Sequence, residues 1–328
     1  MGILNVSFYL KFRNNGSALI SVLILLGFVS SLLTILLNVG KQDQEQIGQY
    51  QKNNIIYTHI HAVEDFAINI LNIDFQNSPN MTYQSENWGN PIEPFSVGSY
   101  TVSLKIKDLQ SKININSLVL NNSDVNYIQL ERLVSLFDQL DINQDLIYAI
   151  IDWIDYDSEV FSSSGGEDDY YLSLNPGYRA ANRAINNLDE VLLIKGFDKT
   201  ILKKLKPYLS AIPREYDTNI NTININTISA LHPMIGLINA EKIIRYRNEK
   251  PFESVKDFAY YCKYNLRLSD STINEITNMI TTKSENFLIE GKISMSDHNL
   301  SFSTIVNHDL DGSQFLKHNR VIQKIKIM

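Results

Sequence analysis

The sequence predicts an α+β protein that begins with a long apolar helix and carries a large helical insertion in its sheet domain. Three observations predict this class. Residues 17–39 form an uncharged apolar run, residues 99–109 alternate between apolar and polar side chains, and further strand patterns appear only after residue 284. Because an isolated strand is not stable, residues 99–109 need partners from the C-terminal part, and the helical stretch 110–283 is therefore an insertion.

The apolar run is long enough to cross a bilayer. As a helix it would extend roughly 34 Å at about 1.5 Å per residue. Lys11 and Arg13 precede it, and charges of both signs follow from Lys41, which predicts a cytoplasmic N-terminus and an exported remainder. Apolar residues then recur at three- and four-residue steps as far as Phe75, so we expect the helix to continue into the exported domain.

These patterns divide the chain into a leader, a transmembrane helix, a discontinuous α/β domain and an inserted helical domain. The expected boundaries are 1–16, 17–39, 40–109 together with 284–328, and 110–283. We expect a loop at residues 77–98, which are rich in Asn, Pro, Ser and Gly, and a turn at Asp309 to Gly312.

The insertion contains an internal repetition. The sequence Ile-Asn-Ile-Asn occurs at residues 113–116 and again at 223–226, which divides the insertion into parts of about 110–210 and 215–283. In each copy the isoleucines would point inward and an asparagine would cap the following helix. Asn187 and Ser254 are expected to begin further helices.

Composition excludes several functions. The formal net charge is −7, which argues against binding to nucleic-acid phosphates, and the one cysteine, Cys262, allows no intrachain disulfide. The sequence has no HExxH, GxSxG or phosphate-loop motif, so we expect no enzyme activity.

An acidic segment carries the densest chemical signal. Seven carboxylates lie between Asp152 and Asp169, and the next basic residue is Arg179. A solvated acidic loop is one explanation, and a calcium site is the other, because calcium takes six to eight oxygen ligands from irregular loops. An EF-hand is rejected, since Val160 stands where that motif requires glycine.

The N-terminal junction resembles the class III leader of type IV pilins and type II secretion pseudopilins, which a prepilin peptidase cuts after a glycine. This resemblance implies cleavage between Gly16 and Ser17. Most members have glutamate at the fifth mature position, where this chain has Ser21. That departure favours the minor pseudopilin K subtype, and an ordinary signal anchor is the alternative.

The acidic segment is similar to the minor pseudopilin K family of the type II secretion system. The matching stretches are Asp152-Trp-Ile-Asp155, Gly166-Glu-Asp-Asp-Tyr-Tyr171 and Pro176-Gly-Tyr-Arg-Ala-Ala-Asn182, together with the Ile-Asn-Ile-Asn copies. The resemblance implies a pilin-like α/β domain with an inserted all-helical domain of SAM-like repeats. It also implies calcium, with ligands from the acidic segment: Asp155, Asp157, Glu159, Glu167, Asp168 and Asp169.

The function implied by this resemblance is a minor pseudopilin that caps the tip of the periplasmic pseudopilus and helps to initiate its assembly. The bulk of the chain would lie in the periplasm, with one helix in the bacterial inner membrane. Expected partners are minor pseudopilins I and J, and also H, the prepilin peptidase, and secreted proteins, but no nucleic acid. We expect the long helix to contact the other pseudopilins through Ile60, Val63 and Ala67.

Two other functions remain open from sequence. One is a membrane-anchored, calcium-stabilised periplasmic binding domain unrelated to pili. The other is a tethered DNA-binding protein, because residues 233–243 approach a helix-hairpin-helix pattern. In that pattern Met234 replaces a usual glycine, and acidic residues partly cancel the local positive charge.

Overall fold

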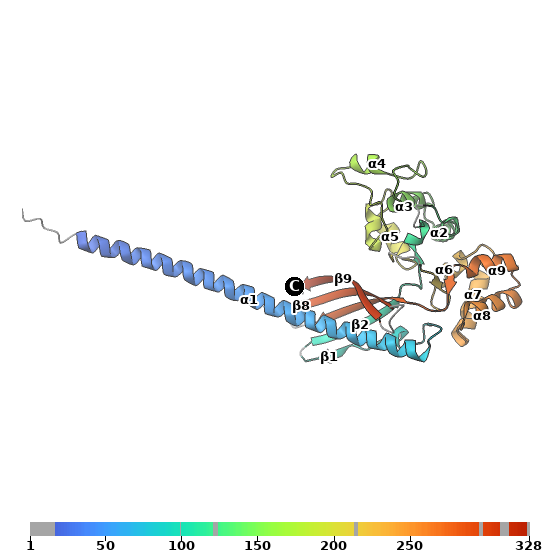
Figure 1. The fold of residues 1–328 in the computed structure, drawn as a ribbon, viewed down its shortest axis with the longest axis horizontal. Coiled ribbons are helices and arrows are strands. Elements are labelled where there is room, and N and C mark those ends of the chain that lie inside the picture. Colours follow the sequence, from blue (N-terminus) through green and yellow to red (C-terminus); the bar gives the residue numbers. More distant parts are fainter. Residues whose placement is uncertain are drawn as a thin grey trace, which may run out of the picture. The chain divides into compact units, whose positions relative to one another are not determined.

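The computed structural model describes residues 17–98, 100–120, 124–212, 216–294, 298–308 and 315–326. The chain divides into two compact units, one ending at His61 and the other beginning at Ala62. Helix α1 (Ser17–Asn77) runs from the first unit into the second (Figure 1). Within it, Leu19–Gln42 is long and apolar enough to cross a membrane, with a mean hydropathy of 2.7. The predicted long N-terminal helix is thus confirmed.

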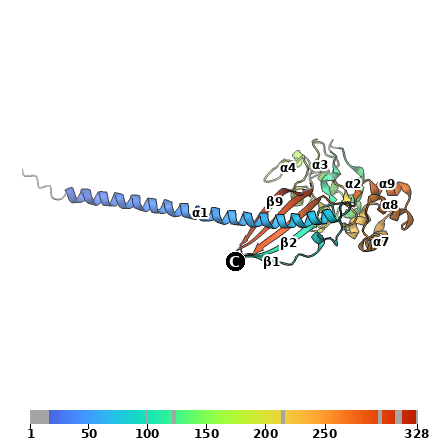
Figure 2. The same cartoon turned by 60° about the horizontal axis from the view of Figure 1, so that its bottom comes forward.

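The second unit contains a five-stranded sheet, in which each neighbouring pair is antiparallel (Figure 2). The strands follow the order β1 (Phe95–Val97), β2 (Tyr100–Asp108), β7 (Asn286–Ser294), β8 (His298–His308) and β9 (Phe315–Lys326). The strand before the insertion therefore pairs with the strand after it, as the sequence predicts. The turn expected at Asp309 to Gly312 lies outside the described residues.

Residues 77–98 are not simply a loop, so that prediction was partly wrong. They include the 3-10 helix η1 (Asn87–Gly89) and strand β1. Asp74 of α1 fixes η1, because its carboxylate accepts hydrogen bonds from Asn87 Nδ2 at 2.5 Å and from Trp88 N at 2.9 Å. A three-residue strand is too short to produce a visible alternation, which explains why the sequence pattern did not indicate it.

The C-terminal part of α1 packs within the second unit. Leu71 is 2% exposed, and Glu64 Oε1 accepts a hydrogen bond from Thr304 Oγ1 of β8 at 2.6 Å. Val63 and Ala67, which belong to the same unit, are 4% and 0% exposed. The prediction of a partner-binding face is therefore wrong for Val63 and Ala67, whose side chains are already buried in this chain. Ile60 belongs to the first unit, and its part in a partner contact stays a prediction.

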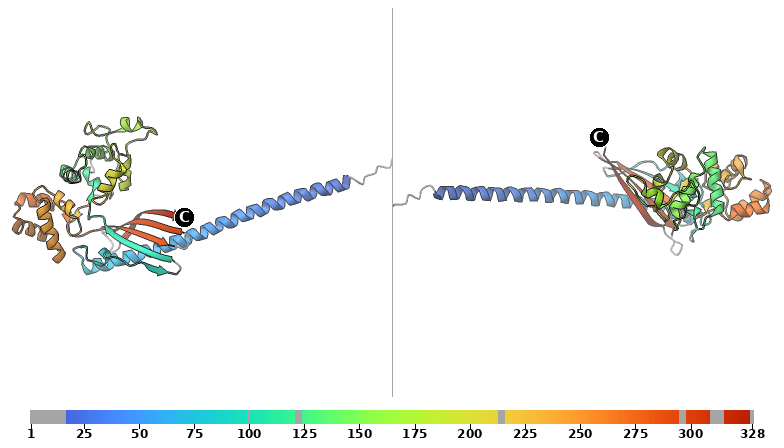
Figure 3. Two further views of the ribbon diagram at one scale, coloured as in Figure 1. Left: turned by 180° about the vertical axis from the view of Figure 1, so that it is seen from behind. Right: turned by 90° about the horizontal axis from the view of Figure 1, so that it is seen from above.

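The chain between β2 and β7 folds around two hydrophobic cores (Figure 3). The first core extends from Ile113 to Ala211 and includes Ala230, and the second extends from Ile220 to Ile280. The described helices between β2 and β7 are η2 (Ile115–Leu118), α2 (Tyr127–Gln139), α3 (Leu146–Ile154), α4 (Asp168–Leu172), η3 (Leu188–Leu193), α5 (Lys199–Leu205), α6 (Ile225–Ala230), α7 (Gly236–Glu249), α8 (Val255–Tyr264) and α9 (Asp270–Thr277).

The insertion also contains two short strand pairs, which the expectation of an all-helical domain omits. Strand β3 (Ile113–Asn114) pairs in parallel with β4 (Leu209–Ser210), and β5 (Thr218–Asn219) with β6 (Ile280–Thr281). Each pair joins the beginning of a core to its end. Two residues show no periodicity, so these pairs could not be predicted from the pattern.

The predicted helix starts are confirmed. Asn224 Oδ1 accepts from Thr227 N at 3.0 Å at the start of α6, and Asn114 caps η2 through Asn116 N. Asn187 begins η3 and Ser254 begins α8, each with its side chain accepting a backbone N–H. These caps satisfy N–H groups that have no partner within the helix.

Candidate metal centre

The acidic segment follows the end of α3 and is folded back by a buried carboxylate. Asp152 Oδ1 accepts from Phe161 N at 2.9 Å, and Oδ2 accepts from Gly166 N at 2.7 Å. The backbone of Gly165 passes so close that a Cβ atom there would lie 1.9 Å from Asp152 Oδ2. Only glycine fits this approach, and Asp152 thereby holds both ends of the loop against α3.

The folded loop brings three carboxylates together. One oxygen from each of Asp155, Asp157 and Glu167 lies within 4.8 Å of the others. Asp155 and Glu167 are each 4% exposed, whereas Asp157 is exposed. Three carboxylates at this separation repel one another unless a proton or a cation compensates their charge.

The buried members of this cluster lack hydrogen-bond donors. Asp155 Oδ1 and both carboxylate oxygens of Glu167 are buried without a partner among the described residues. Burial, followed by the charges of Asp157 and Asp152, raises the pKa of Asp155 to about 7. Burial, followed by the charges of Asp155 and Asp152, raises the pKa of Glu167 to about 8. The site therefore has unsatisfied acceptors and an excess of negative charge.

The other three predicted ligands lie outside the cluster. Asp168 is engaged elsewhere, because its oxygens accept from Arg179 Nη1 at 2.9 Å and from Ala180 N at 3.0 Å. Glu159 and Asp169 are exposed. The structure thus brings together three of the six residues that the sequence suggested.

Two residues that shape the candidate metal centre, Asp152 and Asn182, are absent from the ligands suggested by the sequence. Asp152 was recognised as acidic, but its backbone contacts depend on a fold that spacing does not reveal. Asn182 donates from Nδ2 to Asp157 O at 3.2 Å, and its Oδ1 is buried without a partner in the described structure. An asparagine oxygen is an ordinary calcium ligand, so Asn182 Oδ1 is a further candidate.

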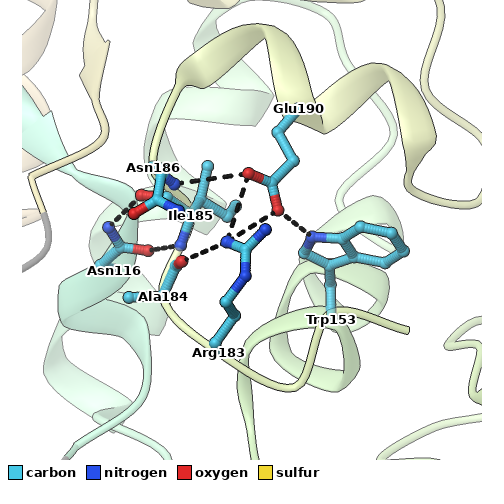
Figure 4. A network of polar contacts seen from close by, with 7 residues as sticks. All are labelled: Asn116, Trp153, Arg183, Ala184, Ile185, Asn186 and Glu190. Carbon is cyan, nitrogen blue, oxygen red and sulfur yellow. Dashed lines mark hydrogen bonds and ion pairs between the residues drawn. The ribbon is translucent and has the colours of Figure 1, made fainter. Parts of the chain in front are cut away.

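A polar network fixes residues 183–186, which directly follow Asn182 in the chain (Figure 4). Glu190 accepts from Trp153 Nε1 of α3 at 3.2 Å and forms an ion pair with Arg183 at 3.2 Å. Asn116 accepts from Ile185 N at 2.7 Å and donates to Ile185 O at 2.9 Å. These contacts join α3, η3 and η2 of the first core to the residues that directly follow Asn182.

The donor set fits calcium better than zinc or copper. All candidate atoms are carboxylate or amide oxygens, and the loop is irregular, as calcium sites commonly are. The residues that would hold the ion are Asp155, Asp157 and Glu167, with Asn182 beside them. Such an ion would offset most of the negative charge of the cluster and link the end of α3 to the start of α4.

The predicted processing site is only partly covered. Gly16 lies outside the described residues, and Ser17 is the first residue of α1. Cleavage between them therefore stays a prediction.

Known proteins similar to this chain share one name. Residues 111–214, which contain most of the first core and the candidate metal centre, match the family model described as type II secretion system (T2SS), protein K. The type II secretion system protein K of Aeromonas hydrophila is 27% identical over 261 residues, covering 74% of this chain and 79% of that protein. The protein of the same name from Pseudomonas aeruginosa is 26% identical over 315 residues, covering 91% and 90%.

The fold has a counterpart among solved structures. A chain in the crystal structure of the GspK-GspI-GspJ complex of the enterotoxigenic Escherichia coli type 2 secretion system superposes with a TM-score of 0.71. The similarity covers 85% of this chain and 99% of that chain at 19% identity, so it establishes the fold. With the family match over residues 111–214 and the named relatives, the shared fold makes this chain similar to type II secretion system protein K.

Proposed function

We propose that this chain is a minor pseudopilin that caps the tip of the periplasmic pseudopilus and helps to initiate its assembly for the export of folded proteins. The observation that carries the proposal is the shared fold, which matches 99% of a chain from the GspK-GspI-GspJ complex. By analogy with that complex, the partners of this chain are the corresponding minor pseudopilins I and J, and pseudopilin H is a further candidate.

Two features support a position at the tip. The insertion between β2 and β7 adds two helical cores to the sheet domain, and this bulk is hard to accommodate in a regularly packed shaft. In addition, the residue at the fifth position after Gly16 is Ser21, which carries no charge. A neighbour packed above would bring a buried N-terminal ammonium that needs an acidic partner.

The N-terminal helix supports an inner-membrane location with one span. Leu19–Gln42 is long enough to cross the bilayer, and the basic residues precede it. The bulk of the chain would then lie in the periplasm. A prepilin peptidase would remove residues 1–16 on the cytoplasmic side and leave the helix attached.

Calcium is the cofactor that the candidate metal centre supports. Bound to Asp155, Asp157 and Glu167, the ion would stabilise the first helical core and hold the acidic loop in one conformation. Its role is structural, in agreement with a family of secretion-system subunits.

Position in the fibre tests this function. The full-length chain would be produced with the pseudopilins and the peptidase of its own system, and labelled antibody would locate it on the assembled fibre. We expect the label at one end only. Even labelling along the shaft contradicts a cap, and label confined to the membrane favours the calcium-stabilised binding domain unrelated to pili.

Processing gives a second test with a matched control. Gly16→Val should block removal of the leader, because a peptidase pocket shaped for glycine excludes a larger side chain. Gly27→Val makes the same change inside the membrane helix, where an added Cβ meets nothing within 4 Å. Mass spectrometry of each variant identifies its N-terminal residue. We expect an N-terminus at Ser17 for the Gly27→Val control only, and a product of Gly16→Val that begins at Ser17 contradicts the assigned site.

A further inference from the structure

A groove of about 1070 Å³ lies beside β2, away from the candidate metal centre. It is bounded by the C-terminal half of β2, by Leu288 and Glu290 of β7, by the segment around η1, by the start of the insertion, and by α5. Trp88, Pro91, Ile92 and Leu202 contribute apolar atoms to its lining. We call it the edge groove.

The edge groove contains a strand edge without a strand partner in the described structure. Strand β1 pairs with β2 only from Tyr100 to Val102, whereas β7 pairs with β2 as far as Asp108. The segment before β1 contains Pro91 and Pro94, which have no backbone N–H to donate. From Ser103 onward, the outer side of β2 therefore has no strand partner among the described residues, and η1 is the element that contacts β2 there. A strand edge without a partner is a template for pairing with another extended chain.

The lining of the groove is strongly basic, although the chain as a whole is acidic at −7. Six lysines line it: Lys105, Lys107, Lys112, Lys199, Lys203 and Lys206. Lys107 pairs with Glu290 at 2.6 Å, and Lys206 pairs with Asp189 at 3.1 Å. Lys105, Lys199 and Lys203 form no ion pair with any residue that the structure describes.

Two acidic residues, Glu290 and Asp108, also line the groove. Glu290 pairs with Lys107, and Asp108 does not offset the charge of the remaining lysines. Asp108 is 3% exposed, and its carboxylate accepts from Gln110 N at 2.7 Å and Ser284 Oγ at 2.6 Å, so it is turned to the interior. Burial and the nearby Lys107 lower the pKa of Lys112 to about 8, which a bound carboxylate would reverse. The groove thus combines a free strand edge with uncompensated positive charge.

We propose that the edge groove binds an extended acidic segment of a second protein, which adds as a strand to the outer edge of β2. Strand addition would supply backbone hydrogen bonds over about six residues, or roughly 20 Å of extended chain. Because side chains alternate along a strand, carboxylates at every second position would meet the lysines of β2 and α5. A second copy of this chain is disfavoured as the occupant, because each copy carries a net negative charge.

The proposal can be tested with a defined probe and the full-length chain in detergent micelles. The probe is a fluorescein-labelled peptide of alternating glutamate and valine, about 10 residues long, and fluorescence anisotropy measures its Kd. We expect the double variant Lys199→Gln/Lys203→Gln to weaken binding about tenfold. The matched control is Lys242→Gln/Lys250→Gln, which removes the same charge from two exposed positions, one on α7 and one directly after it, and should leave Kd unchanged.

A second arm tests the hydrogen bonding. Methylation of alternate backbone nitrogens in the peptide, on the side facing β2, should abolish binding, because a strand then cannot donate to the edge. Equal binding of the methylated peptide overturns strand addition, and equal weakening by both lysine pairs overturns the assignment to this groove.

The remaining outcomes concern other occupants. If the Lys199→Gln/Lys203→Gln variant binds phosphatidylglycerol vesicles more weakly but binds the peptide as the natural chain does, the groove recognises lipid and the proposal is wrong. If the same variant differs only by weaker self-association, measured by sedimentation, the occupant is a second copy of this chain and the proposal is also wrong.

Discussion

The two helical cores of the insertion use the same structural device, but only one of them carries an acidic loop. In the first core, Asn114 accepts from Ile212 N at 3.0 Å and donates to Ile212 O at 3.1 Å. In the second, Asn221 accepts from Phe252 N and donates to Phe252 O, both at 2.9 Å. Each asparagine therefore pairs with the backbone of a distant residue as a strand would.

The cores differ in how they compensate buried polar groups. The second core is closed by Arg247, which donates to the carbonyl oxygens of Ile220 and Ile223, both at 2.5 Å. The first core holds Asp155 and Glu167 with unsatisfied oxygens. The second core therefore satisfies these backbone carbonyls with its own guanidinium, whereas the acidic site of the first has carboxylate oxygens without a donor among the described residues.

The largest expected effect comes from removing the carboxylate that folds the loop. Asp152→Ala should lower the free energy of unfolding of the first core by about 2–3 kcal/mol, because the buried N–H of Gly166 and the partly buried N–H of Phe161 lose their acceptor. Asp257→Ala, the same change at the start of α8 in the second core, should have an effect of less than about 1 kcal/mol. Urea unfolding of the full chain, followed by hydrogen exchange in each core, gives both values, and equal losses would contradict this role of Asp152.

Removal of calcium should produce the next largest effect, and only in the first core. At a hundredfold excess over Kd, binding to the folded state stabilises it by about 2.7 kcal/mol. The double variant Asp155→Asn/Glu167→Gln should lose this response and be more stable than the natural chain in chelator, because the charge repulsion is removed. Thermal unfolding with calcium and with chelator measures both, and a variant that still responds to calcium would exclude these ligands.

The junction between the sheet and the second core should make the stability of the chain depend on pH, through Asp108 at the end of β2. Burial raises the pKa of Asp108 to about 6, although Ser284, Thr222 and Gln110 donate to it. The folded state therefore binds a proton more tightly than the unfolded state, and this residue's contribution to stability should decrease as the pH rises from about 4 to about 6. Asp108→Asn should flatten this part of the stability curve. An unchanged slope in the variant would assign the pH dependence to other groups.

The smallest effect should come from a helix cap. Asn224→Ala removes the acceptor for Thr227 N at the start of α6 and should destabilise the second core by about 1 kcal/mol. Asn226→Ala is the control, because Asn226 Nδ2 donates only to Tyr208 Oη at 3.1 Å among the described contacts. Equal decreases in the free energy of unfolding for both variants would contradict a stabilising role of the Asn224 cap. Chemical denaturation of the two variants in parallel provides the comparison.

Periodicity predicted the elements that are long, and it missed those that are short. The long helix and strands β2, β7 and β8 follow regular patterns, and the asparagine caps were visible as local motifs. Strand β1 and the two short strand pairs have only two or three residues each, so no pattern could reveal them. The sequence repetition also aligned Ile113–Asn116 with Ile223–Asn226, and so Asn114 with Asn224. The asparagine that matches Asn114 in its contacts is instead Asn221, three residues before Asn224.

The candidate site illustrates a different limit. Composition indicated an oxygen-rich cation site, but it could not separate Asp155 and Glu167, which the fold buries, from Asp168, which Arg179 engages. The hydrophobic pattern of α1 identified Val63 and Ala67 correctly as apolar-face residues. Their assignment to a partner interface failed because periodicity shows which face is buried and not what covers it.

Calcium-dependent hydrogen exchange tests the central claim most directly. Amide exchange of the full-length chain would be measured by mass spectrometry in calcium and in chelator, with residues 111–212 and 218–281 followed separately. The difference between the cores predicts that calcium slows exchange in the first region, most strongly around Asp155 and Glu167, and leaves the second unchanged. Equal protection in both regions, or no change in either from demonstrably metal-free protein, would contradict it.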